Sequence, residues 1–113
     1  MNKINFNNKT FSLISNTENG KANSDTIFEY KQKGELVTAD YYGGDVLYGK
    51  IIAHHQGKQL NMLYQCITTK NELKAGKAIA EISITKDLKI KLSLNWEWLD
   101  NKHEKGISEY LEN

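Results

Sequence analysis

The chain of 113 residues has a single cysteine, Cys66, and almost no excess of one charge. One cysteine excludes an internal disulfide framework and is typical of a reducing compartment. The 15 basic and 14 acidic residues leave a formal net charge of +1. That charge is too small to attract nucleic acid or an anionic membrane over the whole surface. We therefore expect neither nucleic acid nor a membrane as a partner.

Long apolar runs are also missing. The first residues, MNKINFNNKTF, lack the apolar region of a signal peptide, and the chain contains no run of about 18 apolar residues. Together with the lone cysteine, these absences predict a cytoplasmic protein, with secretion without a leader as the alternative. The length permits a single domain over residues 1–113, built around one hydrophobic core.

Motifs of catalysis and metal binding are absent as well. Residues 44–51, GDVLYGKI, match part of a phosphate-binding loop but have Ile51 where a Ser or Thr must reach Mg²⁺. His54 and His55 are neighbours in an expected strand, so they project to opposite faces and cannot bind one metal ion. Cys66 shares the parity of Met62 and Tyr64, which places it on the apolar inner face of its run. Burial in apolar surroundings raises the pKa of a thiol and makes it unreactive. The sequence predicts no catalytic residue, no metal ligand and no cofactor.

The chain does contain a regular alternation of apolar and polar residues in short runs. In residues 89–100, KIKLSLNWEWLD, every second position from Ile90 to Trp98 is apolar. A period of two is typical of β-strands, and Gly, Asn or Lys/Asp clusters separate most runs at hairpin distances. The pattern predicts an all-β, antiparallel up-and-down meander of about eight to nine strands. Because closure removes unpaired edges, we expect a small closed β-barrel rather than an open sandwich.

The more apolar parity of each run predicts which side chains face the interior. This expected interior consists of Phe28, Tyr30, Val37, Ala39, Tyr41, Leu47, Gly49, Ile51, Ala53, Met62, Tyr64, Cys66, Ala78, Ala80, Ile82, Ile84, Ile90, Leu92, Leu94, Trp96 and Trp98. Its alanines and its glycine either make room for the two tryptophans or leave a cavity that the tryptophans line. Both outcomes occur in barrels of about eight strands.

Aromatic residues with polar tips are frequent on this inner face. A barrel filled for stability alone could use Leu, Ile and Val, whereas buried indole and phenol groups need hydrogen-bond partners. Those partners are either other groups of the barrel or a ligand. On the second interpretation, a small apolar or amphipathic ligand would bind to Tyr30, Tyr41, Tyr64, Trp96 and Trp98.

The order of the motifs resembles a family of small bacterial proteins of about this length. T-x-F-x-Y-x-Q-x-G begins at Thr26, a Y-x-G-G turn ends at Gly44, and W-x-W spans Trp96 to Trp98. The resemblance covers nearly the whole chain and implies a calycin-like or lipocalin-like barrel. Proteins of this family sometimes carry the name N-acetylglutamate synthase. An acetyltransferase needs a glycine-rich loop that opens a helix, and this sequence contains neither, so that activity is a remote alternative.

The sequence therefore favours two classes of function over an enzyme. A ligand carrier or sensor would use the barrel interior, where concave sites commonly host small molecules. A non-enzymatic interaction module or homodimer would use the exterior and leave the interior filled. An enzyme would require a convergent pair of titratable groups, which the parity of the strands does not produce. The sequence favours the ligand-binding barrel, with the interaction module as the alternative.

Overall fold

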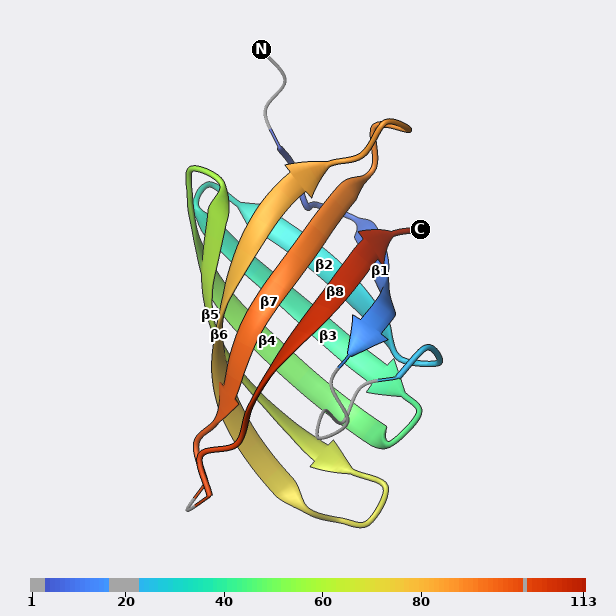
Figure 1. The fold of residues 1–113 in the computed structure, drawn as a ribbon, viewed down its shortest axis with the longest axis vertical. Coiled ribbons are helices and arrows are strands. Elements are labelled where there is room, and N and C mark those ends of the chain that lie inside the picture. Colours follow the sequence, from blue (N-terminus) through green and yellow to red (C-terminus); the bar gives the residue numbers. More distant parts are fainter. Residues whose placement is uncertain (1–3, 17–22, 101) are drawn as a thin grey trace.

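The computed structural model describes residues 4–16, 23–100 and 102–113, which form a closed antiparallel β-barrel of eight strands (Figure 1). Each strand pairs with its neighbour in sequence, and β1 pairs with β8 to close the barrel. The expected all-β up-and-down barrel is confirmed. The strands are β1 (Lys9–Asn16), β2 (Ile27–Lys33), β3 (Leu36–Gly43), β4 (Val46–Gln56), β5 (Gln59–Thr68), β6 (Leu73–Ile84), β7 (Ile90–Trp98) and β8 (Lys105–Glu112). The described residues include no helix long and apolar enough to cross a membrane.

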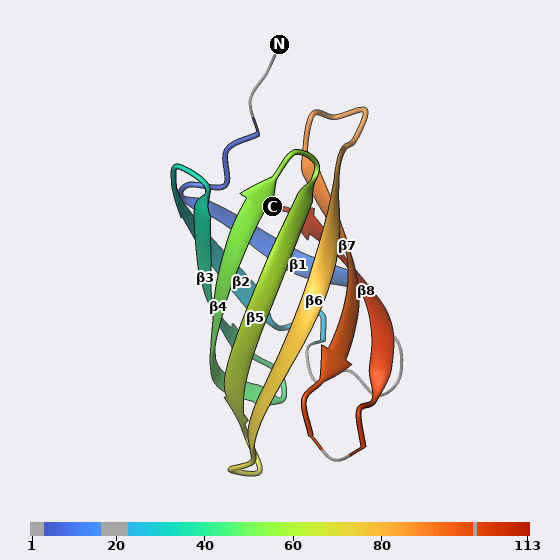
Figure 2. The same ribbon diagram turned by 90° about the vertical axis from the view of Figure 1, so that its left-hand side faces the viewer.

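The barrel has two ends that differ in what covers them. The upper end in Figure 1 carries the segment 4–8 and the turns 34–35, 57–58 and 85–89. The lower end carries the turns 44–45 and 69–72 and the connection from β7 to β8. The quarter-turned view in Figure 2 shows the same division, with the N-terminal segment at the upper end.

The alternation expected for the strands is present in the barrel wall. The inward residues of β7 are each no more than 6% exposed, and they are Ile90, Leu92, Leu94, Trp96 and Trp98. Their polar neighbours along the strand are half-buried or exposed. A side-chain period of two in a wall with one buried face accounts for this pattern. Both tryptophans therefore point inward from one strand, as the sequence predicts.

Two of the expected interior residues are exposed instead. Leu47 is 52% exposed and Ile84 is 49% exposed. The register of β4 against β5 shifts between Val46 and Tyr48, and such a bulge changes which face the next side chain occupies. Val46, only 3% exposed, consequently takes the inward position in place of Leu47. Ile84 is the last residue of β6, where the barrel no longer covers its side chain.

The upper end of the barrel is filled by aromatic rings. Phe6, which precedes β1, is fully buried, and its ring centroid lies 5.9 Å from that of Phe11 and 5.5 Å from that of Tyr30. The backbone N–H of Phe6 donates to Oε1 of Gln32 at 2.9 Å. The ring of Phe6 also packs edge-on against His55, at 5.8 Å between centroids. Dense ring packing of this kind places the N-terminal segment as a plug over the upper end.

Candidate functional site

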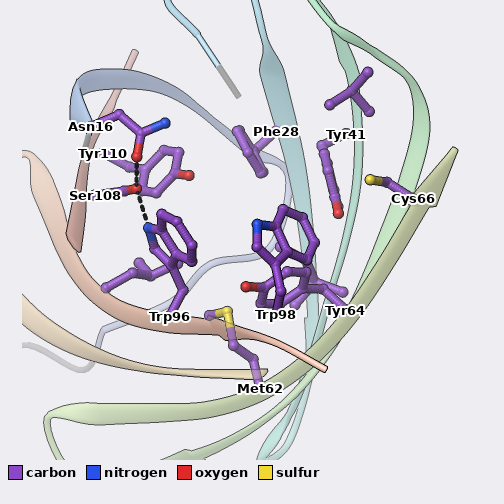
Figure 3. Close-up of a pocket in the computed structure, with 13 residues that line it drawn as sticks. Asn16, Phe28, Tyr41, Met62, Tyr64, Cys66, Trp96, Trp98, Ser108 and Tyr110 are labelled. Carbon is purple, nitrogen blue, oxygen red and sulfur yellow. Dashed lines mark hydrogen bonds between the residues drawn. The ribbon is translucent and has the colours of Figure 1, made fainter. Parts of the chain in front are cut away.

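A cavity of about 50 Å³ lies inside the barrel toward its lower end (Figure 3). Side chains from seven of the eight strands surround it, and those described are Asn16, Phe28, Tyr41, Val46, Ile51, Met62, Tyr64, Cys66, Leu94, Trp96, Trp98, Ser108 and Tyr110. A single water needs about 10–15 Å³ measured in this way, so the cavity has room for a few waters. It is much smaller than the roughly 300 Å³ at which drug-sized pockets begin. The interior is therefore mostly filled by side chains, with one small cavity described.

Small residues on neighbouring strands determine where the tyrosine rings lie. Tyr41 on β3 is paired with Gly49 on β4, and a Cβ at Gly49 would overlap the ring of Tyr41. Tyr64 on β5 is paired with Gly76 on β6 in the same way, and a Cβ there would overlap its ring. Aromatic side chains laid over glycines are a known device for stabilising strands at such positions. The two glycines therefore direct both phenol rings toward the cavity.

The two tryptophans occupy equivalent inward positions but differ in their hydrogen bonds. Trp96 Nε1 donates to the hydroxyl of Ser108 at 2.7 Å, and that hydroxyl donates in turn to Oδ1 of Asn16. Trp98 Nε1 is also buried but has no hydrogen-bond partner among the described residues. In Figure 3 its nitrogen lies on the edge of the ring that faces Trp96 and Tyr110 across the cavity. One donor of the wall is therefore unpaired and directed into the cavity.

Lys74 lies beside Trp98 at the lower end. Its Nζ is 4.7 Å from the centroid of the indole ring and 3.4 Å from Oδ2 of Asp100. Burial favours a raised pKa for Asp100, but the backbone N–H groups of Lys102 and His103 and the ammonium of Lys74 outweigh it and lower that pKa. Asp100 is thus ionised at neutral pH, and it balances the charge of the only cation that contacts Trp98 among the described residues.

The cavity wall itself is uncharged at neutral pH. None of the described residues that line it is an Asp, Glu, Lys or His. Burial raises the pKa of Tyr110 to about 12, and burial likewise raises the pKa of Tyr41 and of Tyr64. The three phenols are therefore neutral and can donate hydrogen bonds. Tyr41 makes one such bond to the carbonyl of Gln65, which is long at 3.4 Å.

The structure brings together four of the five residues that the sequence suggested for a ligand. Tyr41, Tyr64, Trp96 and Trp98 line the cavity. Tyr30 is as deeply buried, but its ring packs against Phe6 and Phe11 in the upper half of the barrel. It is not among the residues that surround the cavity. Tyr30 does face the barrel interior, as predicted. Its position along the barrel axis, near the upper end, separates it from the other four residues.

The sequence interpretation did not include several residues of the cavity wall. Asn16 and Ser108 carry polar side chains, and a sequence pattern assigns polar residues of a strand to the outer face. The pattern assigns Val46 to the outer face because the bulge in β4 cannot be read from the sequence. Tyr110 and Ser108 share the inner face of β8. The more apolar parity of this run consists of Ile107 and Leu111, so the period of two does not indicate Tyr110. The pairing of β1 with β8 that brings Asn16 to Ser108 joins the two ends of the chain. No local pattern indicates such a contact.

The histidines and acidic residues do not form a second site. His54 lies 3.1 Å from Glu35, and His103 lies 3.3 Å from Glu97, both at the surface. His55 faces the opposite way from His54, and its Nδ1 accepts a hydrogen bond from Nε2 of Gln32 at 3.1 Å, beneath the plug. In residues 4–16, 23–100 and 102–113, no three His, Cys, Asp or Glu side chains come close enough to hold a metal ion.

Comparison with known proteins identifies the family of this barrel. A family model described as avidin-like protein matches residues 4–113, which is nearly the whole chain. No curated protein and no solved structure matches the sequence. The match agrees with the closed eight-stranded meander and with the calycin-type architecture that the motifs imply. The chain belongs to the avidin-like protein family, whose barrel is a fold that binds small ligands in its interior.

Proposed function

We propose that this protein binds a small ligand in the lower half of its barrel. The observation that carries the proposal is the unpaired Nε1–H of Trp98, which is buried at the wall of a cavity. A buried donor without a partner costs about 1–3 kcal/mol, and an acceptor on a ligand would recover that free energy. Family membership supports the same site, because the avidin-like fold binds small ligands within the barrel.

The remaining wall suits an apolar or amphipathic molecule. Phe28 and Met62 supply apolar surface, while Tyr64 and Trp98 present polar tips beside it. Such a mixture of apolar lining and a few convergent polar groups is typical of small-molecule sites. Tyr64 is only half-buried, and its ring packs against Trp98 at 5.7 Å between centroids. A movement of this ring is the simplest way in which the cavity would enlarge for a bigger ligand.

Intrinsic fluorescence can test this proposal, since both tryptophans lie at the cavity. A panel of small apolar and amphipathic compounds is screened for a change in tryptophan emission. For a compound that binds, Trp98→Leu should weaken binding by about 1–3 kcal/mol, because apolar contact and the donor are both lost. Ile79→Ala serves as the control, since Ile79 is an exposed residue on the outer face. A destabilised Trp98→Leu variant of a protein that binds no compound of the panel would contradict the proposal.

The exterior supports a second candidate function, the binding of another copy of this chain. Five exposed aliphatic residues line one open groove across the outer face, and they are Leu36, Ile52, Leu63, Ile79 and Ile107. Glu35, Glu97, Lys77 and Lys105 border the same groove. Because both signs of charge are present, a twofold-related copy could place opposite charges together while covering the aliphatic surface.

The oligomeric state decides this second candidate. We expect light scattering after size exclusion to give the mass of a dimer for the native chain and of a monomer for Leu63→Lys. Leu63 is 62% exposed, so the substitution leaves the core intact. Leu88→Lys is the matched control, because Leu88 is 77% exposed and lies outside the groove. A monomeric native protein at high concentration would rule out the dimer and leave the ligand site unaffected.

A further inference from the structure

We infer that the ligand of this cavity is a neutral hydrogen-bond acceptor of the carbonyl or amide class, held by Trp98 Nε1, rather than a carboxylate or an ammonium group. The inference rests on the proposed function, which it narrows. Three properties of the cavity lead to it: the charge of the wall, the direction of its unpaired polar group, and its volume.

The charge of the wall disfavours an ionised ligand. No described residue that lines the cavity carries a charge at neutral pH. Lys74, which approaches the ring of Trp98, is not part of the lining and is paired with Asp100 at 3.4 Å. A carboxylate or an ammonium group that entered the cavity would lose its hydration without gaining a counter-charge. The desolvation of an unpaired ion costs far more than that of a neutral polar group.

The unpaired polar group is a donor. An indole nitrogen donates one hydrogen bond and accepts none, so only an acceptor can satisfy Trp98. The equivalent donor on Trp96 is already bonded to Ser108, and the hydroxyl of Tyr41 bonds to the carbonyl of Gln65. An ammonium group has no lone pair, so such a ligand would present only further donors and leave the indole nitrogen of Trp98 unpaired. A carbonyl oxygen presents the lone pairs that the site lacks.

The volume limits the size of the group that enters. A cavity of about 50 Å³ accommodates a few non-hydrogen atoms, whereas a cavity that binds benzene has a volume of about 150 Å³. A planar carbonyl group with one or two small substituents fits this range, whereas an aromatic ring would require Tyr64 to move. Acetamide and acetate are therefore suitable probes, because they have nearly the same shape and differ in charge at pH 7.

Nuclear magnetic resonance of the ¹⁵N-labelled protein gives a direct readout. The chain has two tryptophans and hence two indole N–H signals, which Trp96→Phe assigns by removing one. We expect acetamide to shift the signal of Trp98 downfield and to leave that of Trp96 nearly unchanged. Acetate and methylammonium should bind at least tenfold more weakly than acetamide at pH 7. Trp98→Phe should lower the affinity for acetamide at least tenfold, and Ile79→Ala, at an exposed position outside the cavity, should change it less than threefold.

The outcomes separate this inference from the proposed function. Acetate binding as tightly as acetamide to the native protein would overturn the neutral class, and this comparison needs no variant that has to fold. Equal affinity of Trp98→Phe and the native protein for acetamide would overturn the role of the indole donor. If acetamide leaves Trp98 unchanged while other compounds bind inside the barrel, the inference fails and the proposed function stands. If no compound perturbs either indole signal, both fail.

Discussion

The two ends of this barrel are built from the same strands but are completed differently. At the upper end, Phe6 is fully buried against Phe11, Tyr30 and His55, and its backbone N–H is bonded to Gln32. At the lower end, no such plug is described, and the rings surround a cavity with one unpaired donor. In this barrel the segment 4–8 contributes the ring of Phe6 to the upper end, and that ring fills space among Phe11, Tyr30 and His55.

Strand β7 shows the same contrast along its length. Leu92, near the middle of the barrel, is completely buried within the core, while Trp96 and Trp98 farther down border the cavity. Cross-strand partners explain how the large rings fit, because Trp96 lies opposite Ala78 and Trp98 opposite Gly76. Large residues placed opposite small ones fill the taper of a small barrel. In this barrel, the pairing of large with small residues leaves a cavity of about 50 Å³ at the lower end.

The largest loss of stability is expected from a substitution in the packed rings of the upper end. Phe11→Ala should lower the free energy of unfolding by about 3–5 kcal/mol, because it opens a cavity among rings that have little freedom to collapse. Denaturant unfolding measures this loss. Ile14→Ala on the same strand is the control, since Ile14 is 51% exposed, and it should cost less than about 0.5 kcal/mol. Similar losses for both variants would mean that the upper end is not tightly packed.

A smaller effect should follow from displacing a ring of the lower end. Gly49→Ala introduces a Cβ that overlaps the ring of Tyr41, and we expect a loss of about 1–3 kcal/mol from overpacking. A double-mutant cycle with Tyr41→Leu isolates the contact. In the Tyr41→Leu background the further cost of Gly49→Ala should nearly vanish. Additive costs in the cycle would show that the glycine serves the backbone rather than the ring.

The smallest expected effect is the difference in stability between variants of the two tryptophans. Trp96→Phe removes a hydrogen bond to Ser108, whereas Trp98→Phe removes a donor that has no partner. With a similar loss of ring volume in both, Trp96→Phe should destabilise the protein by about 1–3 kcal/mol more than Trp98→Phe. Thermal and denaturant unfolding of the two variants, side by side, provide the measurement. Equal destabilisation would indicate that Trp98 Nε1 has a partner in solution.

The period of two made the fold and most of the wall predictable. It placed both tryptophans inside and led to four residues that now line one cavity, Tyr41, Tyr64, Trp96 and Trp98. It failed at Leu47, where a bulge reverses the face of the strand, because a bulge depends on the register of the neighbouring strand. It also grouped Tyr30 with the cavity, because parity indicates which face a residue occupies and not how far along the barrel axis it lies.

The strands, most of their inner faces and the closed meander could be predicted from the sequence, since these depend on local alternation and short turns. The hydrogen bonds of the two indoles depend instead on tertiary contacts: among the described residues, Trp96 Nε1 has a partner and Trp98 Nε1 has none. That distinction depends on Ser108 and Asn16, which barrel closure brings together from opposite ends of the chain.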